Sequence, residues 1–154
     1  MGEYKVFYGE YLHSIDEKGR IIIPSKFRNI LENKYIDKFV ILKWPDNCIA
    51  VFTEQGFEKD VKKPLQKPSW AKAAARDLNR VLGSNVSFVT CDSQGRINIP
   101  QKLLEGANIT KEVAVIGTGN HFEIWDVERW KQREQEISLE EILEKLADSF
   151  EKEE

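Results

Sequence analysis

Two short segments of this chain place an arginine four residues after an aspartate, Asp16 before Arg20 and Asp92 before Arg96. A carboxylate at that spacing can accept hydrogen bonds from the backbone of a tight turn and from the guanidinium itself. A guanidinium held in one orientation presents a planar fork that matches phosphate oxygens or the edge of guanine. The pattern therefore favours DNA recognition, with the arginines as contacts and the aspartates as the residues that orient them.

Further basic side chains accompany these turns. Lys18, Lys26 and Arg28 belong to the first copy of the pattern, and Lys102 occupies the position in the second copy that matches Lys26. Isolated surface charges are usually only solvated, but these lie beside a turn that the chain contains twice, which favours contacts with the DNA backbone. Leu104 stands where the first copy has Arg28, so we expect the first turn to bind DNA more strongly than the second.

The two turns belong to a longer unit that occurs twice. Residues 13–26 and 89–102 share seven identities in fourteen positions at a shift of 76. The similarity continues more loosely between residues 39–52 and 112–125 once three residues are dropped between the segments. An internal duplication of this kind predicts two copies of one supersecondary unit.

Each copy predicts the order strand, turn, strand, helix and hairpin. Asp-x-x-Gly supplies the turn, because glycine tolerates positive φ, and the alternating isoleucines that follow point into the core. A proline then suits the first turn of a short helix. The predicted helices cover residues 25–32 and 101–106, and the predicted hairpins join 40–43 to 49–52 and 113–116 to 122–125.

The remaining segments connect and extend the two units. Residues 62–68 form a basic, proline-containing linker before a helix over residues 69–82, with Ser69 as its N-cap. A long helix over residues 127–150, interrupted near Ser138, carries an apolar face in its last turns. We therefore divide the chain into a first repeat, a linker with the central helix, a second repeat, and a C-terminal helix with an acidic tail, at residues 5–56, 57–84, 85–130 and 131–154.

A single unit has too few strands to close a sheet or to bury both of its faces. Two units interleaved about a pseudo-twofold axis can do so. The sequence therefore predicts an α+β fold in which two tandem β-rich repeats form one pseudo-twofold β-barrel with flanking helices. Ile22, which faces away from the predicted core and corresponds to Asn98 in the second copy, suggests a contact between subunits.

The net charge of −3 conceals an uneven distribution. Residues 134–154 hold nine acidic and two basic side chains, a balance of −7, and residues 1–133 hold 21 basic and 17 acidic ones, a balance of +4. A mildly basic body is compatible with double-stranded DNA as a partner. The acidic tail is most simply a solvated helix.

Other features exclude several classes of protein. Cys48 and Cys91 lack the spacing of a zinc site, so we expect reduced thiols, no metal, no other cofactor and no small-molecule ligand. No stretch approaches the roughly 18 apolar residues of a membrane span, and the start of the chain has no apolar leader. These observations predict a cytoplasmic protein with no membrane partner, associated with the nucleoid through DNA.

The doubled Asp-x-x-Gly-Arg-Ile-x-Ile-Pro segments, each followed by a hairpin, resemble the MraZ family of bacterial transcriptional regulators over nearly the whole chain. The resemblance implies two tandem AbrB-like swapped-hairpin domains, each with a DxxxR signature, here residues 16–20 and 92–96. It also implies a regulator that binds tandem promoter boxes of the division and cell-wall gene cluster, including its own promoter. A ring-like homo-oligomer without cofactor or catalytic activity is part of the same implication.

Two other classes of function stay open. An enzyme is disfavoured because the two histidines, His13 and His121, lie in no recognisable triad or metal motif. Asp16 and Asp92 each have an arginine that keeps the carboxyl ionised instead of poised as an acid. An antitoxin-like interaction module of the swapped-hairpin fold is the second alternative, disfavoured by two fused copies and an ordered-looking helical end.

Overall fold

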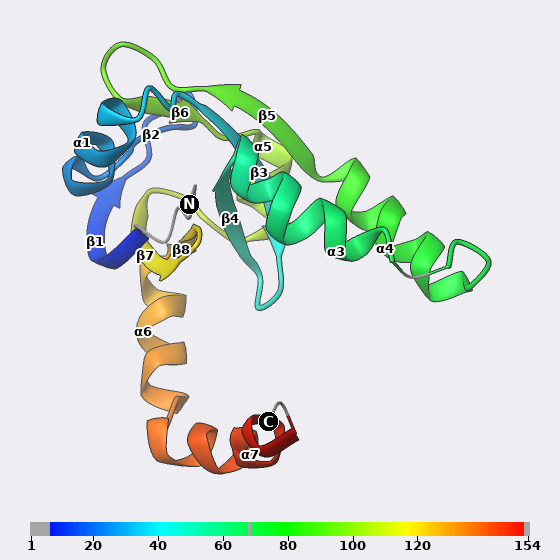
Figure 1. The fold of residues 1–154 in the computed structure, drawn as a ribbon. Helices are drawn as coiled ribbons and strands as arrows, with labels where there is room; N and C mark the ends of the chain where they lie inside the picture. The colour runs from blue at the N-terminus through cyan, green and yellow to red at the C-terminus, as the bar shows by residue number, and fades with distance from the viewer. Residues whose placement is uncertain (1–6, 68, 153–154) are drawn as a thin grey trace.

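The computed structural model describes residues 7–67 and 69–152 (Figure 1). Residues 5 and 6 of the predicted first repeat, Pro68 of the predicted linker and residues 153 and 154 of the tail lie outside these ranges. The first repeat contains β1 (Phe7–Ser14), β2 (Arg20–Ile22), α1 (Ser25–Asn33), β3 (Lys38–Trp44) and β4 (Cys48–Thr53). The second repeat contains β5 (Val86–Thr90), β6 (Arg96–Asn98), α5 (Gln101–Gly106), β7 (Glu112–Gly119) and β8 (Phe122–Asp126).

The two repeats exchange their first strands. The main sheet is antiparallel in the order β1-β7-β8-β4-β3-β5, so β1 of the first repeat pairs with the hairpin of the second and β5 pairs with the hairpin of the first. Replacing every strand by its counterpart in the other repeat reverses this order and leaves the same neighbours. The predicted interleaving about a pseudo-twofold axis is therefore confirmed.

Two residue pairs mark that axis. β2 and β6 form a separate two-stranded ladder in which Ile21 faces Ile97, and β4 pairs with β8 around Ala50 and Glu123. Each of these central pairs has neighbours on either side that are related by the duplication, such as Arg20 with Asn98 and Ile22 with Arg96. The axis passes through both ladders.

The predicted closure into one barrel is not seen. Within the described residues, β1 and β5 each have a partner on only one side and form the two edges of the six-stranded sheet. The tight turn after each of these strands leads the chain into β2 or β6, which pair with each other instead of extending the sheet. The architecture is an α+β fold with one open sheet of six strands and one ribbon of two.

The alternating isoleucines of both repeats lie in the core as predicted. Ile21, Ile23, Ile97 and Ile99 are all buried, and they share a cluster with aromatic side chains such as Phe27. Full burial of one such side chain contributes about 1.5–3 kcal/mol. A second apolar cluster, which includes Val40, Leu42, Ala50, Phe52 and Val61, contains side chains of β3 and β4 that alternate with those in the main core.

The alignment of the two hairpins needs one correction. The strand registers place Lys38 opposite Thr90 and Glu112 opposite Ser14, so Lys38 and not Phe39 is the counterpart of Glu112. Only two of the three dropped residues therefore precede the hairpin. The third lies in the β3–β4 turn, which has three residues between Trp44 and Cys48. The corresponding β7–β8 turn has only two residues between Thr118 and His121, and Thr118 N donates to His121 O across it.

Helices between and after the repeats differ partly from the prediction. The segment 54–65 is helical, as α2 (Glu54–Phe57), η1 (Glu58–Lys62) and α3 (Lys63–Leu65), although the sequence indicated no helix there. Thr53 caps it by accepting from Gly56 N at 2.9 Å, and Val61 anchors it in the second apolar cluster. The central helix α4 (Ala73–Ser84) begins four residues later than predicted, and Ser69 Oγ accepts only from Ala71 N.

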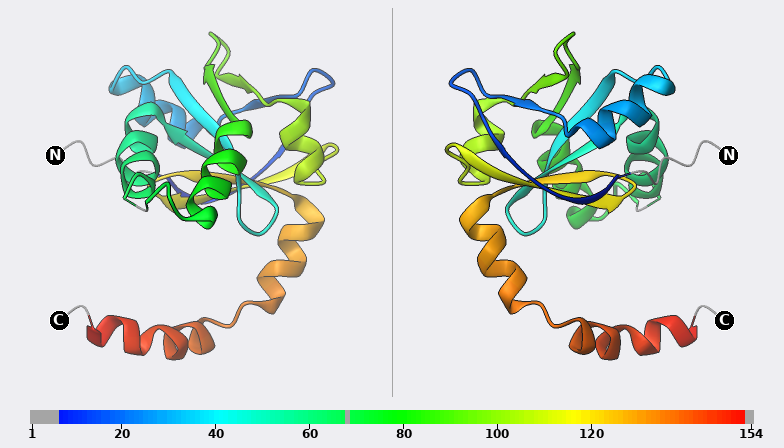
Figure 2. Two further views of the ribbon diagram at one scale, coloured as in Figure 1. Left: turned by 90° about the vertical axis from the view of Figure 1, so that its right-hand side faces the viewer. Right: turned by 90° about the vertical axis from the view of Figure 1, so that its left-hand side faces the viewer.

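The C-terminal helix is interrupted as predicted. α6 (Val127–Glu136) ends before Ile137, and α7 (Leu139–Lys152) begins after Ser138. Figures 1 and 2 show α6 leading away from the sheet and α7 standing apart from the rest of the molecule. No helix within the described ranges has the length and apolar character required to cross a membrane.

Candidate nucleic-acid interface

The first Asp-x-x-x-Arg turn is closed by a single carboxylate. Asp16 Oδ1 accepts from Lys18 N and Arg20 N, each at 2.9 Å, and Asp16 Oδ2 accepts from Arg20 Nε at 2.7 Å. Gly19 completes the turn by donating to Asp16 O at a φ of +78°, which favours glycine. The aspartate therefore orients the backbone and the guanidinium together.

The second turn repeats this geometry almost atom for atom. Asp92 Oδ1 accepts from Gln94 N and Arg96 N at 2.9 Å, and Asp92 Oδ2 accepts from Arg96 Nε at 2.8 Å. Gly95 has a φ of +81° and donates to Asp92 O. Because two different sequences converge on one arrangement, the arrangement depends on the shared Asp, Gly and Arg.

Both arginines keep their outer nitrogens available. Each uses Nε for its aspartate, and within residues 7–67 and 69–152 no hydrogen bond from their Nη atoms to the protein is found. The side chain of Arg20 is 29% exposed and that of Arg96 is 23% exposed. A partly buried guanidinium with an open outer edge can make bidentate contacts to a phosphate or a guanine.

Hydrogen bonds also keep the two aspartates ionised. The backbone N–H of Arg20 lowers the pKa of Asp16, with further contributions from its guanidinium and from Lys18 N. The backbone N–H of Arg96 lowers the pKa of Asp92 in the same way. Neither carboxyl is therefore suited to donate a proton at neutral pH, which argues against a role as a general acid.

Each turn is fixed to the other repeat. Gly95 O accepts from Ile23 N at 2.9 Å, and Gly19 O accepts from Ile99 N at 2.8 Å. These bonds continue the β2–β6 ladder at both ends, so the two turns flank one short ribbon. Figure 2 shows the turns as the blue loop after β1 and the green loop after β5, both projecting on the side of the molecule opposite α7.

Arg28 lies against the second turn, although the sequence suggested a place beside the first. A side-chain atom built on Gly95 would meet Arg28 Cδ at 2.5 Å, and Arg28 Nε donates to Ile23 O at 2.8 Å. The swap explains the difference, because α1 of one repeat packs over the turn of the other. Leu104, the counterpart of Arg28, lies against Gly19 in the equivalent place.

The predicted lysines are distributed more widely. Lys18 lies in the first turn and Lys26 in the first turn of α1, and both are exposed. Lys102 lies in α5, where its Nζ donates to Ser84 O at 3.3 Å and so caps the last turn of α4. The structure therefore brings Arg28 and Arg96 to one turn, keeps Lys18 and Arg20 at the other, and gives Lys102 a structural contact.

Two further residues on the ribbon were not identified as candidate contacts from the sequence. Asn98 pairs with Arg20 and Ile22 pairs with Arg96, and both are exposed on the face opposite the buried isoleucines. Asparagine can read adenine through two hydrogen bonds, and an exposed apolar side chain can contact the methyl group of thymine. The signal was present in the strand alternation, which places residues 20, 22, 96 and 98 on one face.

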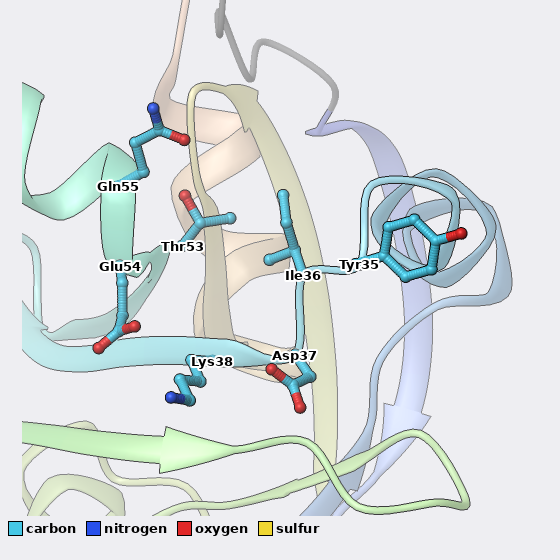
Figure 3. Close-up of a pocket in the computed structure, with 7 residues that line it drawn as sticks. All are labelled: Tyr35, Ile36, Asp37, Lys38, Thr53, Glu54 and Gln55. Atoms are coloured by element: carbon cyan, nitrogen blue, oxygen red, sulfur yellow. The ribbon is translucent and has the colours of Figure 1, made fainter.

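A pocket elsewhere offers no alternative chemistry. Figure 3 shows a pocket lined by seven residues, including Asp37, Lys38 and Glu54, which come from the α1–β3 connection, the start of β3, the end of β4 and the start of α2. Thr53 Oγ1 is already used to cap α2, and the Tyr35 ring lies apart from the other side chains. The pocket combines no nucleophile with a base, and its two carboxylates disfavour an anionic ligand.

The chain is similar to known proteins over most of its length. A family model described as "MraZ protein, putative antitoxin-like" matches residues 6–81 and again residues 84–152, so the two halves match the same model. A curated relative from Finegoldia magna (strain ATCC 29328 / DSM 20472 / WAL 2508), "Transcriptional regulator MraZ", is 43% identical over 134 residues. This alignment covers 87% of the chain and 90% of the relative.

Proposed function

This chain belongs to the MraZ family, and we propose on that basis that it is a sequence-specific DNA-binding regulator of transcription. The observation that carries the proposal is the pair of matching turns, each with an arginine that is held through Nε by its own aspartate and whose Nη atoms have no hydrogen bond to the described residues. A transcriptional regulator needs no catalytic group, and we propose none. We also propose no cofactor and no small-molecule ligand.

The β2–β6 ribbon is the element that we propose to enter the major groove. A two-stranded antiparallel ribbon fits that groove, and its outer face carries Arg20, Ile22, Arg96 and Asn98. The arginines supply bidentate contacts to guanine or to phosphate, and Asn98 and Ile22 add contacts to neighbouring bases. In this proposal Ile22 contacts DNA and not another subunit.

The other basic residues position the ribbon. Lys18, Lys26 and Arg28 lie beside the turns, where they are suited to contact the phosphates on both sides of the groove. Lys102 contributes less, because it is partly engaged with Ser84 O. Arg28 supplies the second turn with the positive charge that Lys18 supplies to the first. The two turns therefore contribute more equally to DNA binding than the sequence suggests.

The biological target follows from the family resemblance. We propose that the protein binds tandem boxes in the promoter of the division and cell-wall gene cluster, including its own promoter, in the cytoplasm at the nucleoid. Residues 5–56 and 85–130 are the two DNA-binding repeats, with residues 57–84 as connection and 131–154 as extension. A ring-like oligomer sums many weak contacts along several boxes, which allows strong binding by a body with a charge of only +4.

A gel-shift series on the upstream promoter of the protein's own gene tests this function. Arg20→Ala is expected to weaken binding to the promoter by about 1–3 kcal/mol and to remove the preference over a scrambled duplex. Lys18→Ala is expected to weaken binding to both duplexes alike and to reduce the salt dependence by about one counterion. Promoter binding by Arg20→Ala as tight as that of the wild type would refute the assignment.

A further inference from the structure

Helix α7 presents an apolar face that the rest of the described chain does not cover. Leu139, Leu143, Leu146 and Phe150 lie on this face together with Ile142, and their exposed fractions range from 36% to 69%. Figures 1 and 2 show α7 standing clear of the sheet. An amphipathic helix of this length gains most of its stability from burial of its apolar stripe against a partner.

Side-chain hydrogen bonds fix the start of α6 to the body of the protein. Arg129 donates from Nη1 to Asn47 O at 2.6 Å and from Nη2 to Asp46 O at 2.9 Å. Trp130 Nε1 donates to Glu10 Oε1 at 2.6 Å. These bonds join the start of α6 to the β3–β4 turn and to β1, both of the first repeat.

A groove on the same chain has the chemistry that α7 requires. Phe57, Val61 and Leu65 form one wall, and Leu82, Val86 and Phe88 form the other, around a volume of about 350 Å³. The groove leads into the second apolar cluster, which includes Val61 and packs against Leu82 and Val86. Phe88 lies at its rim and is 67% exposed, although it belongs to a strand of the main sheet.

The charges of the two surfaces are complementary. Residues 58–82 supply six of the residues that line the groove, and this segment holds seven basic and three acidic side chains, whereas residues 139–150 hold four acidic and one basic. The balances are +4 and −3, and opposite charges of this size steer association and fix its partner. The pseudo-symmetric surface on the other half is less suited to an acidic helix, because Glu10 stands where the groove has Val86.

We propose that α7 of one copy docks into the groove between the segment 54–65 and α4 of a second copy. The two surfaces are different patches of the chain, so the contact is heterologous. Repeated contacts of this kind form a closed ring when the rotation between neighbouring subunits is a whole fraction of a full turn. The inference rests on the oligomer of the proposed function and gives that oligomer its contact surface. It concerns protein association alone and is tested without DNA.

The mass of the full-length chain, measured by size-exclusion chromatography with light scattering, tests the proposal. The wild type is expected to be an oligomer. Leu143→Asp/Leu146→Asp removes the apolar face of α7, Phe88→Asp places a negative charge in the groove, and each variant is expected to be a monomer. Leu12→Asp is the matched control, because Leu12 is the counterpart of Phe88 on the other edge strand and is 66% exposed. It is expected to keep the wild-type mass.

Mixing the α7 variant with the groove variant gives a sharper result. The α7 variant keeps an intact groove, and the groove variant keeps an intact α7. Each pair can therefore form one contact and no second one, so we expect dimers and no larger oligomer. A monomeric wild type, an α7 variant with the wild-type mass, or Leu12→Asp dissociating as completely as Phe88→Asp would overturn the proposal. The two proposals can fail separately. If Arg20→Ala loses DNA binding but the α7 variant keeps the oligomeric mass, this inference is refuted and the proposed function stands.

Discussion

At the scale of single residues, the aspartate of each turn has two tasks that are inseparable in the structure. The carboxylate of Asp16 accepts three hydrogen bonds within the turn, two from the backbone and one from Arg20 Nε. The same contacts that close the turn therefore orient the guanidinium before DNA arrives. An arginine fixed in this way loses less side-chain entropy on binding, which amounts to about 0.5–1.5 kcal/mol for each long side chain.

The pH dependence of stability should report these bonds. The pKa of Asp16 and that of Asp92 are lowered in the folded state, so both groups contribute stability above the unfolded value of about 3.9. That contribution is lost as the pH falls through their lower folded values. Urea unfolding across the acidic range is expected to show a shallower loss of stability in Asp16→Asn/Asp92→Asn than in the wild type. Parallel curves would contradict the assignment.

Arg28 provides a second test at this scale. Leu104 occupies the equivalent place over Gly19, so Arg28→Leu is expected to fold and to retain the second turn. The variant loses one cation beside Arg96, and its affinity for DNA is expected to fall by a few fold at low salt. Anisotropy titrations with a labelled duplex measure the change, and Arg133→Leu on α6 is the control. Equal affinity in Arg28→Leu and wild type would exclude Arg28 from the interface.

At the scale of elements, the exchanged strand β1 depends on one glycine. A side chain on Gly117 would meet the backbone of Phe7 and Tyr8 at 2.5 Å, because Gly117 pairs directly with Gly9. Gly117→Ala is therefore expected to separate β1 from β7 and to destabilise the fold by about 2 kcal/mol or more. Gly106→Ala, with nothing within 4 Å, is the matched control and is expected to be neutral or slightly stabilising in thermal unfolding.

The elements also show where sequence reasoning succeeded and where it could not. The duplicated motif predicted both turns, the short helices and the hairpins, because each depends on local alternation and turn chemistry. The interleaving of the two units was predicted for another reason, namely that one unit has too few strands to bury both of its faces. The helical segment 54–65 was missed because Gly56 and Pro64 are poor helix formers, and the burial of Val61 that stabilises the segment is a tertiary effect.

The position of Arg28 illustrates a limit of a different kind. Its neighbours in the sequence belong to the first turn, but the exchange of strands between repeats carries α1 to the second. Only the spatial arrangement of the two repeats decides which turn it reaches. The same holds for the open sheet, since barrel closure depends on how far the tight turns redirect β2 and β6.

At the scale of the whole molecule, binding strength depends on how many turns act together. Two turns on one chain, multiplied by the subunits of the proposed oligomer, convert weak contacts into strong binding through effective concentration. Affinity for a duplex with two boxes is therefore expected to exceed that for one box by about 10²-fold or more. In the monomeric α7 variant this gain is expected to disappear, as measured by gel shift. A gain retained by the monomer would show that the two turns of one chain suffice.

The most direct test of the oriented arginine is the DNA affinity of Asp16→Asn/Asp92→Asn, measured by anisotropy at fixed salt. The variant has two fewer negative charges next to the DNA-binding surface, so charge alone predicts tighter binding. Orientation by the carboxylates predicts the opposite, a loss of about tenfold for the promoter, because both guanidinium groups must be ordered anew. Binding as tight as that of the wild type, or tighter, would contradict the account.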